Sequence, residues 1–141
     1  MPGIVVPDQG QLELASYCLC ANPSPGFLYL VDLFQNQYTP DQSTTFANFT
    51  LCDFMGYAQV SFPRSKMVAP ITIGHQAQVA YLANPVSWNN NGPQQAVWGF
   101  LVRSNVTGNV LWCQAYNSVQ LVGLGKQLQF DLTLNVFGSN P

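Results

Sequence analysis

The stretch QLQFDLTLNV, residues 127–136, alternates polar and apolar side chains from beginning to end. A period of two places all the apolar side chains of a β-strand on one face and the polar side chains on the other. A helix would spread the same apolar residues around its circumference. The stretch therefore predicts a strand over Gln127–Val136 with one face in a core and the other in water, which is common in antiparallel sheets.

Several further segments have the composition of short strands. Ala96–Arg103 and Val110–Tyr116 are joined by a link rich in turn residues, 104–109, so we expect them to form a hairpin. Gln11–Leu19 fits either a strand or a helix, and the strand is favoured. The other predicted strands are Phe27–Phe34, Tyr57–Phe62 and Ala77–Ala83.

About seven or eight short strands separated by frequent turns are typical of β-sandwiches and small barrels. The sequence therefore predicts one all-β domain over residues 1–141, an antiparallel β-sandwich or small jelly-roll-like barrel. At most a short helical turn is expected, near Thr39–Phe46, where Pro and Asp suit a helix start. A short N-terminal arm, about residues 1–9, and a C-terminal tail, about residues 138–141, would flank the domain.

The charge content restricts the partners. Only 7% of the residues are charged, against about 25% in a typical domain. Four scattered cations cannot neutralise a run of phosphates, so nucleic acid is not an expected partner. No apolar run approaches the roughly 20 residues of a membrane helix, and the N-terminus lacks a signal-peptide pattern. We therefore expect no membrane partner and synthesis in a cytoplasm. The four cations are Arg64, Lys66, Arg103 and Lys126.

Gln, Asn, Ser and Thr supply the polarity instead of charged residues. A surface poor in Lys and Glu resembles the centre of a protein interface, where charged residues are depleted. Low net charge also weakens protection against association. The composition therefore predicts that much of the surface is covered in the working state, with the chain forming a homo-oligomer.

The residues that could carry chemistry are few. His75 is the single histidine, it has no nucleophile motif nearby, and a turn or surface position is expected for it. Asp32 and Asp53 could form a carboxylate pair, but a turn or capping role fits Asp53 better. Gly123–Lys126 lacks the spacing of a phosphate-binding loop. We expect no catalytic residue and no cofactor, and the chain is not predicted to be an enzyme.

Four cysteines are predicted to be free thiols packed as small apolar side chains. The sequence has no C-x-x-C pair and one histidine, so no metal site is expected. The cysteines are Cys18, Cys20, Cys52 and Cys113.

Aromatic residues offer one candidate contact site. Trp98 and Trp112 lie in the predicted hairpin, where a core position is expected. Trp88 precedes an Asn-rich loop and is the best candidate for an exposed contact, together with Asn89, Asn90 and Asn91.

Several segments, in the same order along most of the chain, resemble small virion proteins of tailed bacteriophages. They are Ile4–Pro7, Leu33–Asp41, Asp53–Ala58, Val97–Phe100 and Val110–Trp112. The chain departs from that group in its few charges and its cysteines, and no functional residue carries over.

The resemblance implies a β-rich capsid cement or decoration protein on the virion surface, bound to the major capsid protein. It also implies a trimer at local threefold positions. The alternative is a carbohydrate- or receptor-binding module of a phage tail or fibre, which would use Trp88 and the Asn-rich loop.

Overall fold

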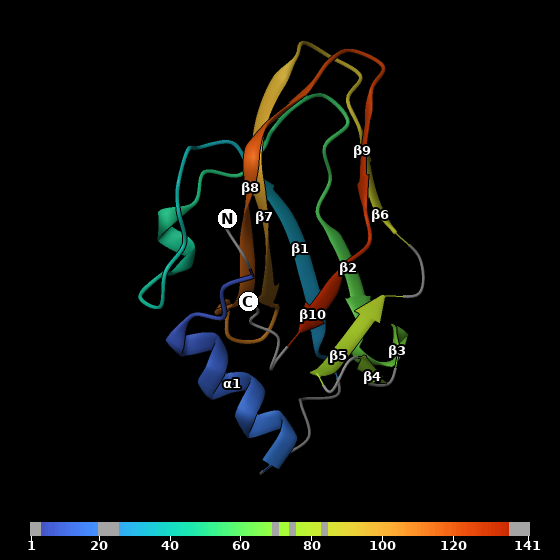
Figure 1. The fold of residues 1–141 in the computed structure, drawn as a ribbon. Coiled ribbons are helices and arrows are strands. Elements are labelled where there is room, and N and C mark those ends of the chain that lie inside the picture. The colour runs from blue at the N-terminus through green and yellow to red at the C-terminus, as the bar shows by residue number, and fades with distance from the viewer. Residues whose placement is uncertain (1–3, 20–25, 69–70, 74–75, 83–84, 136–141) are drawn as a thin grey trace.

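A computed structural model of the chain describes residues 4–19, 26–68, 71–73, 76–82 and 85–135 (Figure 1). The predicted all-β sandwich is confirmed, with one helix added. In chain order the elements are α1 (Asp8–Leu19), β1 (Leu28–Phe34), the 3₁₀ turn η1 (Phe46–Asn48), β2 (Val60–Pro63), the 3₁₀ turn η2 (Arg64–Lys66), β3 (Met67–Val68), β4 (Ile71–Ile73), β5 (Gln76–Leu82), β6 (Val86–Asn89), β7 (Gln95–Ser104), β8 (Val110–Val122), β9 (Gln127–Phe130) and β10 (Thr133–Asn135).

The main sheet has the strand order β2-β1-β7-β8, and all its neighbouring strands are antiparallel. The predicted hairpin is its centre, with Leu101 of β7 opposite Cys113 of β8. Gly108 closes the turn between them with a φ of 75°, a conformation that favours glycine. The Gly108 N–H donates to the Ser104 carbonyl over 2.9 Å.

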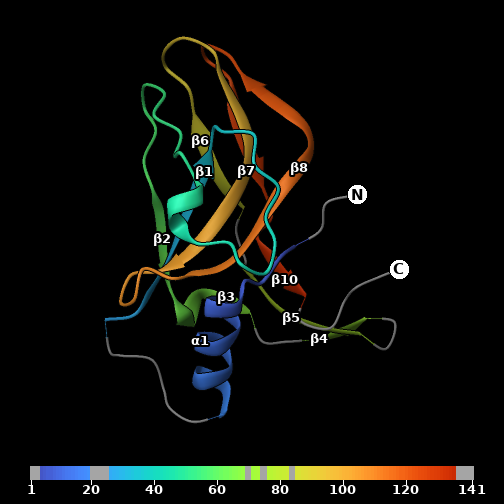
Figure 2. The same ribbon diagram turned by 90° about the vertical axis from the view of Figure 1, so that its left-hand side faces the viewer.

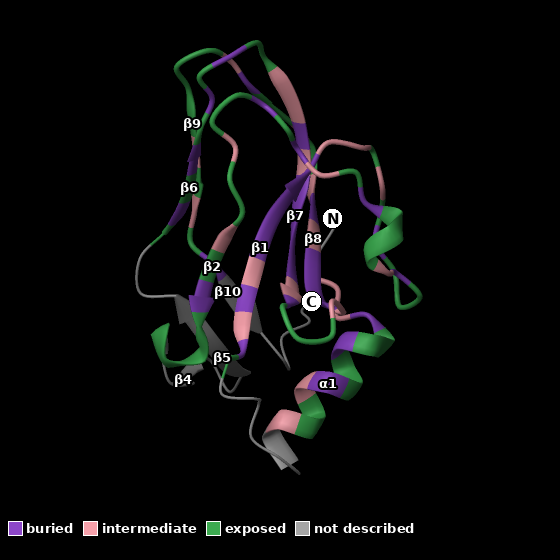
Figure 3. Ribbon diagram, turned by 180° about the vertical axis from the view of Figure 1, so that it is seen from behind, coloured by how far each residue is buried: buried purple, intermediate pink, exposed green. Residues whose placement is uncertain are grey.

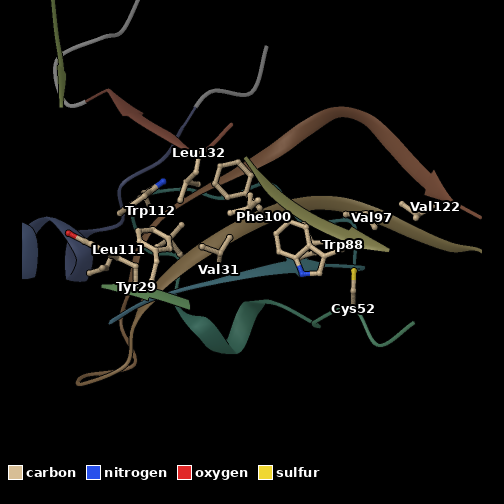
Figure 4. Close-up of a cluster of buried hydrophobic side chains, with 14 of the residues drawn as sticks. Tyr29, Val31, Cys52, Trp88, Val97, Phe100, Leu111, Trp112, Val122 and Leu132 are labelled. Atoms are coloured by element: carbon tan, nitrogen blue, oxygen red, sulfur yellow. The ribbon is translucent and has the colours of Figure 1, made fainter. Parts of the chain in front are cut away.

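A second layer covers the inner face of this sheet (Figure 1). It consists of the pair β6-β9 and of β5 with its partners β3, β4 and β10. Trp88 of β6 and Phe130 of β9 stack with ring centroids 5.7 Å apart, and Phe130 lies 4.8 Å from Phe100 of β7. The core thus lies between the layers, and Figure 4 shows its side chains converging from both.

The outer face of the main sheet is also covered, by the long link between β1 and β2. Phe49 of this link packs on Phe34 with ring centroids 4.8 Å apart, and Leu101 and Cys113 are fully buried beneath it. Figure 3 shows the resulting band of buried residues along β1, β7 and β8.

The alternating stretch 127–136 is not one strand, so that prediction needs correction. Its first part is β9, which pairs with β6, and its second part is β10, which pairs with β5. Asp131 between them is exposed and Leu132 is fully buried, so the alternation of faces persists through the break. Alternation specifies which side chains face the core, but it does not specify which strand the backbone pairs with. Val136 lies outside the described residues.

The strand favoured over Gln11–Leu19 is also wrong, because these residues belong to the helix α1. Asp8 suits the first turn of a helix, and α1 contains no β-branched residue. Gly10 allows the helix to lie close to β8, since a Cβ at this position would sit 2.4 Å from the Leu111 carbonyl oxygen. Within the described residues, no helix combines the length and apolar character needed to cross a membrane.

The segment before α1 lies against the chain's own main sheet. Val5 forms an antiparallel bridge with Cys113, with hydrogen bonds of 2.8 and 2.9 Å in the two directions. Pro7 is buried at the start of the helix. From residue 4 onward, the predicted N-terminal arm is therefore part of the domain.

Candidate functional site

The link between β6 and β7 lies at the end of the molecule that is uppermost in Figure 1, and it includes the predicted contact residues Asn90 and Asn91. Three links meet there: residues 53–57 before β2, residues 89–95 between β6 and β7, and residues 122–127 between β8 and β9. The Asn91 N–H donates to the Met55 carbonyl over 2.8 Å and joins the first two links. We call these three links together the tip.

Asn90 holds the tip together from inside. Its side chain is completely buried, and its Nδ2 donates to the carbonyls of Pro93 and Val122 over 2.9 and 2.7 Å. Its Oδ1 accepts from the Gly92 N–H over 2.8 Å. Its backbone N–H donates to the Lys126 carbonyl, and its own carbonyl accepts from residue 125. One amide side chain therefore satisfies three backbone groups, and these hydrogen bonds hold the links of the tip in place.

Trp88 is buried as well, with 3% of its surface exposed. Figure 4 shows its ring among the core side chains. Its indole N–H donates to the Ala58 carbonyl over 2.8 Å, and its ring stacks on Tyr57 and Phe130. The prediction that Trp88 and Asn90 are exposed contacts is therefore wrong. Along β6, burial alternates strictly, and Trp88 falls on the core face with Val86.

Asn89 and Asn91 are exposed at the tip, as the sequence suggested. Asn89 is on the outward face of β6, opposite Gln127 of β9. Whether Asn89 and Asn91 contact a partner stays a prediction.

Exposed apolar side chains at the tip are a feature that sequence reasoning missed. Met55, Leu121 and Leu124 expose 64%, 61% and 71% of their surface. Leu124 lies between two glycines in a turn, and Gly125 has a φ of 75°. A leucine at the apex of such a turn is the one signal in the sequence that could have identified this patch. Leu121 is the last but one residue of β8, directly before the third link. We call Met55, Leu121 and Leu124 the apolar tip patch.

Asp32 lies on the outer face of the main sheet in a closed network. It is 1% exposed, and its carboxylate accepts from the Tyr57 hydroxyl over 2.7 Å and from Gln59 over 2.6 Å. Arg103 completes the network at 3.4 Å and lies over the Phe46 ring. Burial first, and then the Asp32 charge, raise the pKa of Tyr57. The network therefore ties the β1–β2 region to β7.

Asp53 has partners of its own. Its carboxylate accepts from Gln95 over 2.6 Å and from Gln35 over 3.4 Å. This side-chain cluster fixes the start of the link to β2. The role predicted for Asp53 was a turn or capping role, whereas its carboxylate partners are two glutamine side chains. The two aspartates therefore serve two separate polar networks.

Glu13 anchors α1 to the β7–β8 turn. Its carboxylate accepts from Tyr17 over 2.6 Å, from Asn109 over 3.1 Å, and from the Thr107 hydroxyl. Burial opposes ionisation, but these hydrogen bonds outweigh it and hold the pKa of Glu13 below its ordinary value. Burial and the bond to Glu13 raise the pKa of Tyr17 to about 12.

Cys52 and Cys113 are free thiols buried among apolar side chains, as predicted. Burial raises the pKa of each to about 12, which keeps them protonated and unreactive. Cys18 lies in α1, while Cys20 and His75 fall outside the described residues. In the part of the chain that the structure describes, no three potential metal ligands come together.

The buried carboxylates of Asp32 and Glu13 thus have structural partners, and one end of the molecule exposes apolar side chains at or beside links that backbone hydrogen bonds join. Comparison with known proteins found no match to a family model, to a curated protein or to a solved structure.

Proposed function

We propose that this chain is a structural virion protein, a cement or decoration protein that binds the major capsid protein of a tailed bacteriophage and bridges neighbouring shell subunits. The tip is its contact surface on the shell. The observation that carries the proposal is the combination of the sequence resemblance with an apolar patch on a rigid end of the fold.

The segments that carry the resemblance support a scaffold role, because they pack against one another. Leu33–Asp41 starts in β1, and the Leu33 N–H donates to the Tyr57 hydroxyl of Asp53–Ala58 over 2.9 Å. Asp53–Ala58 also supplies the tip residue Met55. Val97–Phe100 and Val110–Trp112 belong to the central hairpin. The segments that carry the resemblance therefore belong to the central framework of the fold and to the tip.

The interior ionisable groups also fit a binding role better than catalysis. Asp32 and Glu13 are each held by several hydrogen bonds that join separate elements. A catalytic acid or base needs a proton path to a substrate. These carboxylates are instead engaged in holding the fold together.

The apolar tip patch gives the proposed contact its free energy. Full burial of one Leu or Met side chain contributes roughly 1.5–3 kcal/mol. Asn90 fixes the links in advance, so little conformational entropy is lost when they bind. Modest contacts of this kind, repeated around a shell, add through multivalency.

Two leucines of nearly equal exposure provide the test. Leu124 at the tip exposes 71% of its surface, and Leu12 on α1, at the opposite end in Figure 1, exposes 75%. We expect Leu124→Gln to reduce co-sedimentation with empty shells of the major capsid protein encoded beside this chain in the phage genome. Leu12→Gln should leave co-sedimentation unchanged. Equal attachment of both variants would refute the tip as the contact.

The carbohydrate-binding alternative has lost its main support. It relied on an exposed Trp88 ring for stacking, and that ring is buried in the core. Glycan-array binding combined with no binding to shells would nevertheless restore it.

A further inference from the structure

β8 forms one edge of the main sheet. Figure 2 shows it curving along the outer margin of the molecule. Val5 pairs with its outer side at Cys113 through two hydrogen bonds of 2.8 and 2.9 Å. The outer edge of β8 is therefore able to accept an added strand.

Beyond Cys113 this edge has no strand partner among the described residues. The ladder to β7 shifts register between Val97 and Gly99, and residues 116–119 have no partner in that register. They keep the strand conformation nonetheless. On the outer side of β8, away from β7, the backbone N–H and C=O groups of an edge strand are a template for pairing with another chain.

Apart from the register shift opposite Val97 and Gly99, the edge lacks the usual protection against such pairing. Natural edge strands carry charges, prolines, β-bulges or short lengths that prevent association. The segment QAYNSVQL, residues 114–121, contains no charged residue and no proline. The opposite edge, β2, is four residues long and ends at Pro63. The two edges of one sheet therefore differ in protection.

The exposed side chains of the segment suit an identical partner. Asn117, Ser118 and Gln120 are exposed, uncharged, and able both to donate and to accept hydrogen bonds. Two copies of the segment can thus meet without charge repulsion. Leu121, which is 61% exposed, adds apolar surface at one end.

We propose that the outer edge of β8, residues 114–121, pairs with the same edge of a second copy, so that the two main sheets join. Pairing of identical surfaces is isologous and closes as a twofold dimer. This arrangement differs from the trimer that the sequence resemblance implies. It involves no shell protein and shares only Leu121 with the apolar tip patch, so Ser118→Lys and Leu124→Gln test the two proposals separately.

One substitution at two positions tests the proposal. Ser118 on β8 and Ser61 on β2 are both exposed serines, on opposite edges of the main sheet. Ser118→Lys places two like charges at the proposed interface, and we expect the dimer dissociation constant to rise by about tenfold or more. Ser61→Lys should leave it unchanged. Sedimentation velocity over a concentration series measures both, and circular dichroism checks that each variant is folded.

Amide hydrogen exchange gives a second readout on the unaltered protein. Protection of residues 114–121 should increase with protein concentration, and protection of β2 should not. A monomer at all concentrations, a mass of three copies, or equal effects of the two lysines would overturn the proposal. If Ser118→Lys does not fold, Gln120→Lys, also at an exposed position, replaces it.

Discussion

Replacing Asn90 by alanine should destabilise the fold far more than the same change one residue later. The Asn90 side chain serves the Pro93 and Val122 carbonyls and the Gly92 N–H, and it is completely buried. Each buried polar group left without a partner costs about 1–3 kcal/mol. Three such groups, partly relieved by entering water, give an expected loss of about 3–5 kcal/mol in the free energy of unfolding.

Asn91→Ala is the matched control. Asn91 is exposed, and its link to Met55 is made by its backbone N–H, which alanine retains. We expect its effect to stay within about 0.5 kcal/mol. Urea denaturation followed by tryptophan fluorescence measures both variants. A loss below about 1 kcal/mol for Asn90→Ala would refute the view that this side chain holds the tip together.

Two further predictions concern the packing of the sheet and the helix. Gly99→Ala should cost at least about 3 kcal/mol in urea denaturation, because its Cβ would lie 2.2 Å from the Gln114 carbonyl oxygen and 2.5 Å from the Phe34 ring. Gly123→Ala, which meets only the Lys126 side chain at 3.8 Å, should cost little, and equal losses would contradict the clash. Because the pKa of Glu13 is lowered by folding, its contribution is present above the unfolded pKa and lost as pH falls through the folded pKa. Unfolding curves between about pH 5 and 3 should therefore show a weaker pH dependence in Glu13→Gln than in the wild type, and identical slopes would contradict the anchor.

The candidate site was only partly predictable. The sequence directed attention to the right loop, because Asn and Gly mark turns between strands. It could not show that Asn90 is turned inward, since an Asn side chain suits both water and a buried set of backbone groups. The apolar tip patch escaped notice because Met55 lies far from Leu121 and Leu124 in the chain, and the fold places the links that carry or adjoin them at one end.

The sequence by itself determined the fold class and most of the strands. Strict alternation in β9 and the turn residues before β8 depend on local backbone geometry, which acts within a few residues. β6 was not predicted as a strand. The same local reasoning did not recognise α1, because its anchor, Glu13, is polar and gains its partners Thr107 and Asn109 only from the distant hairpin turn.

Tertiary structure alone decided the pairing of the strands. The alternating stretch 127–136 is divided between β6 and β5 because backbone hydrogen bonds are the same for every residue type and do not encode a partner. It also decided which edge of the main sheet is left open. Among the described residues, Val5 pairs with β8 at Cys113, and no strand pairs with the rest of that edge. Local sequence thus specifies faces and turns, whereas partners and edges follow from how the whole chain fills its core.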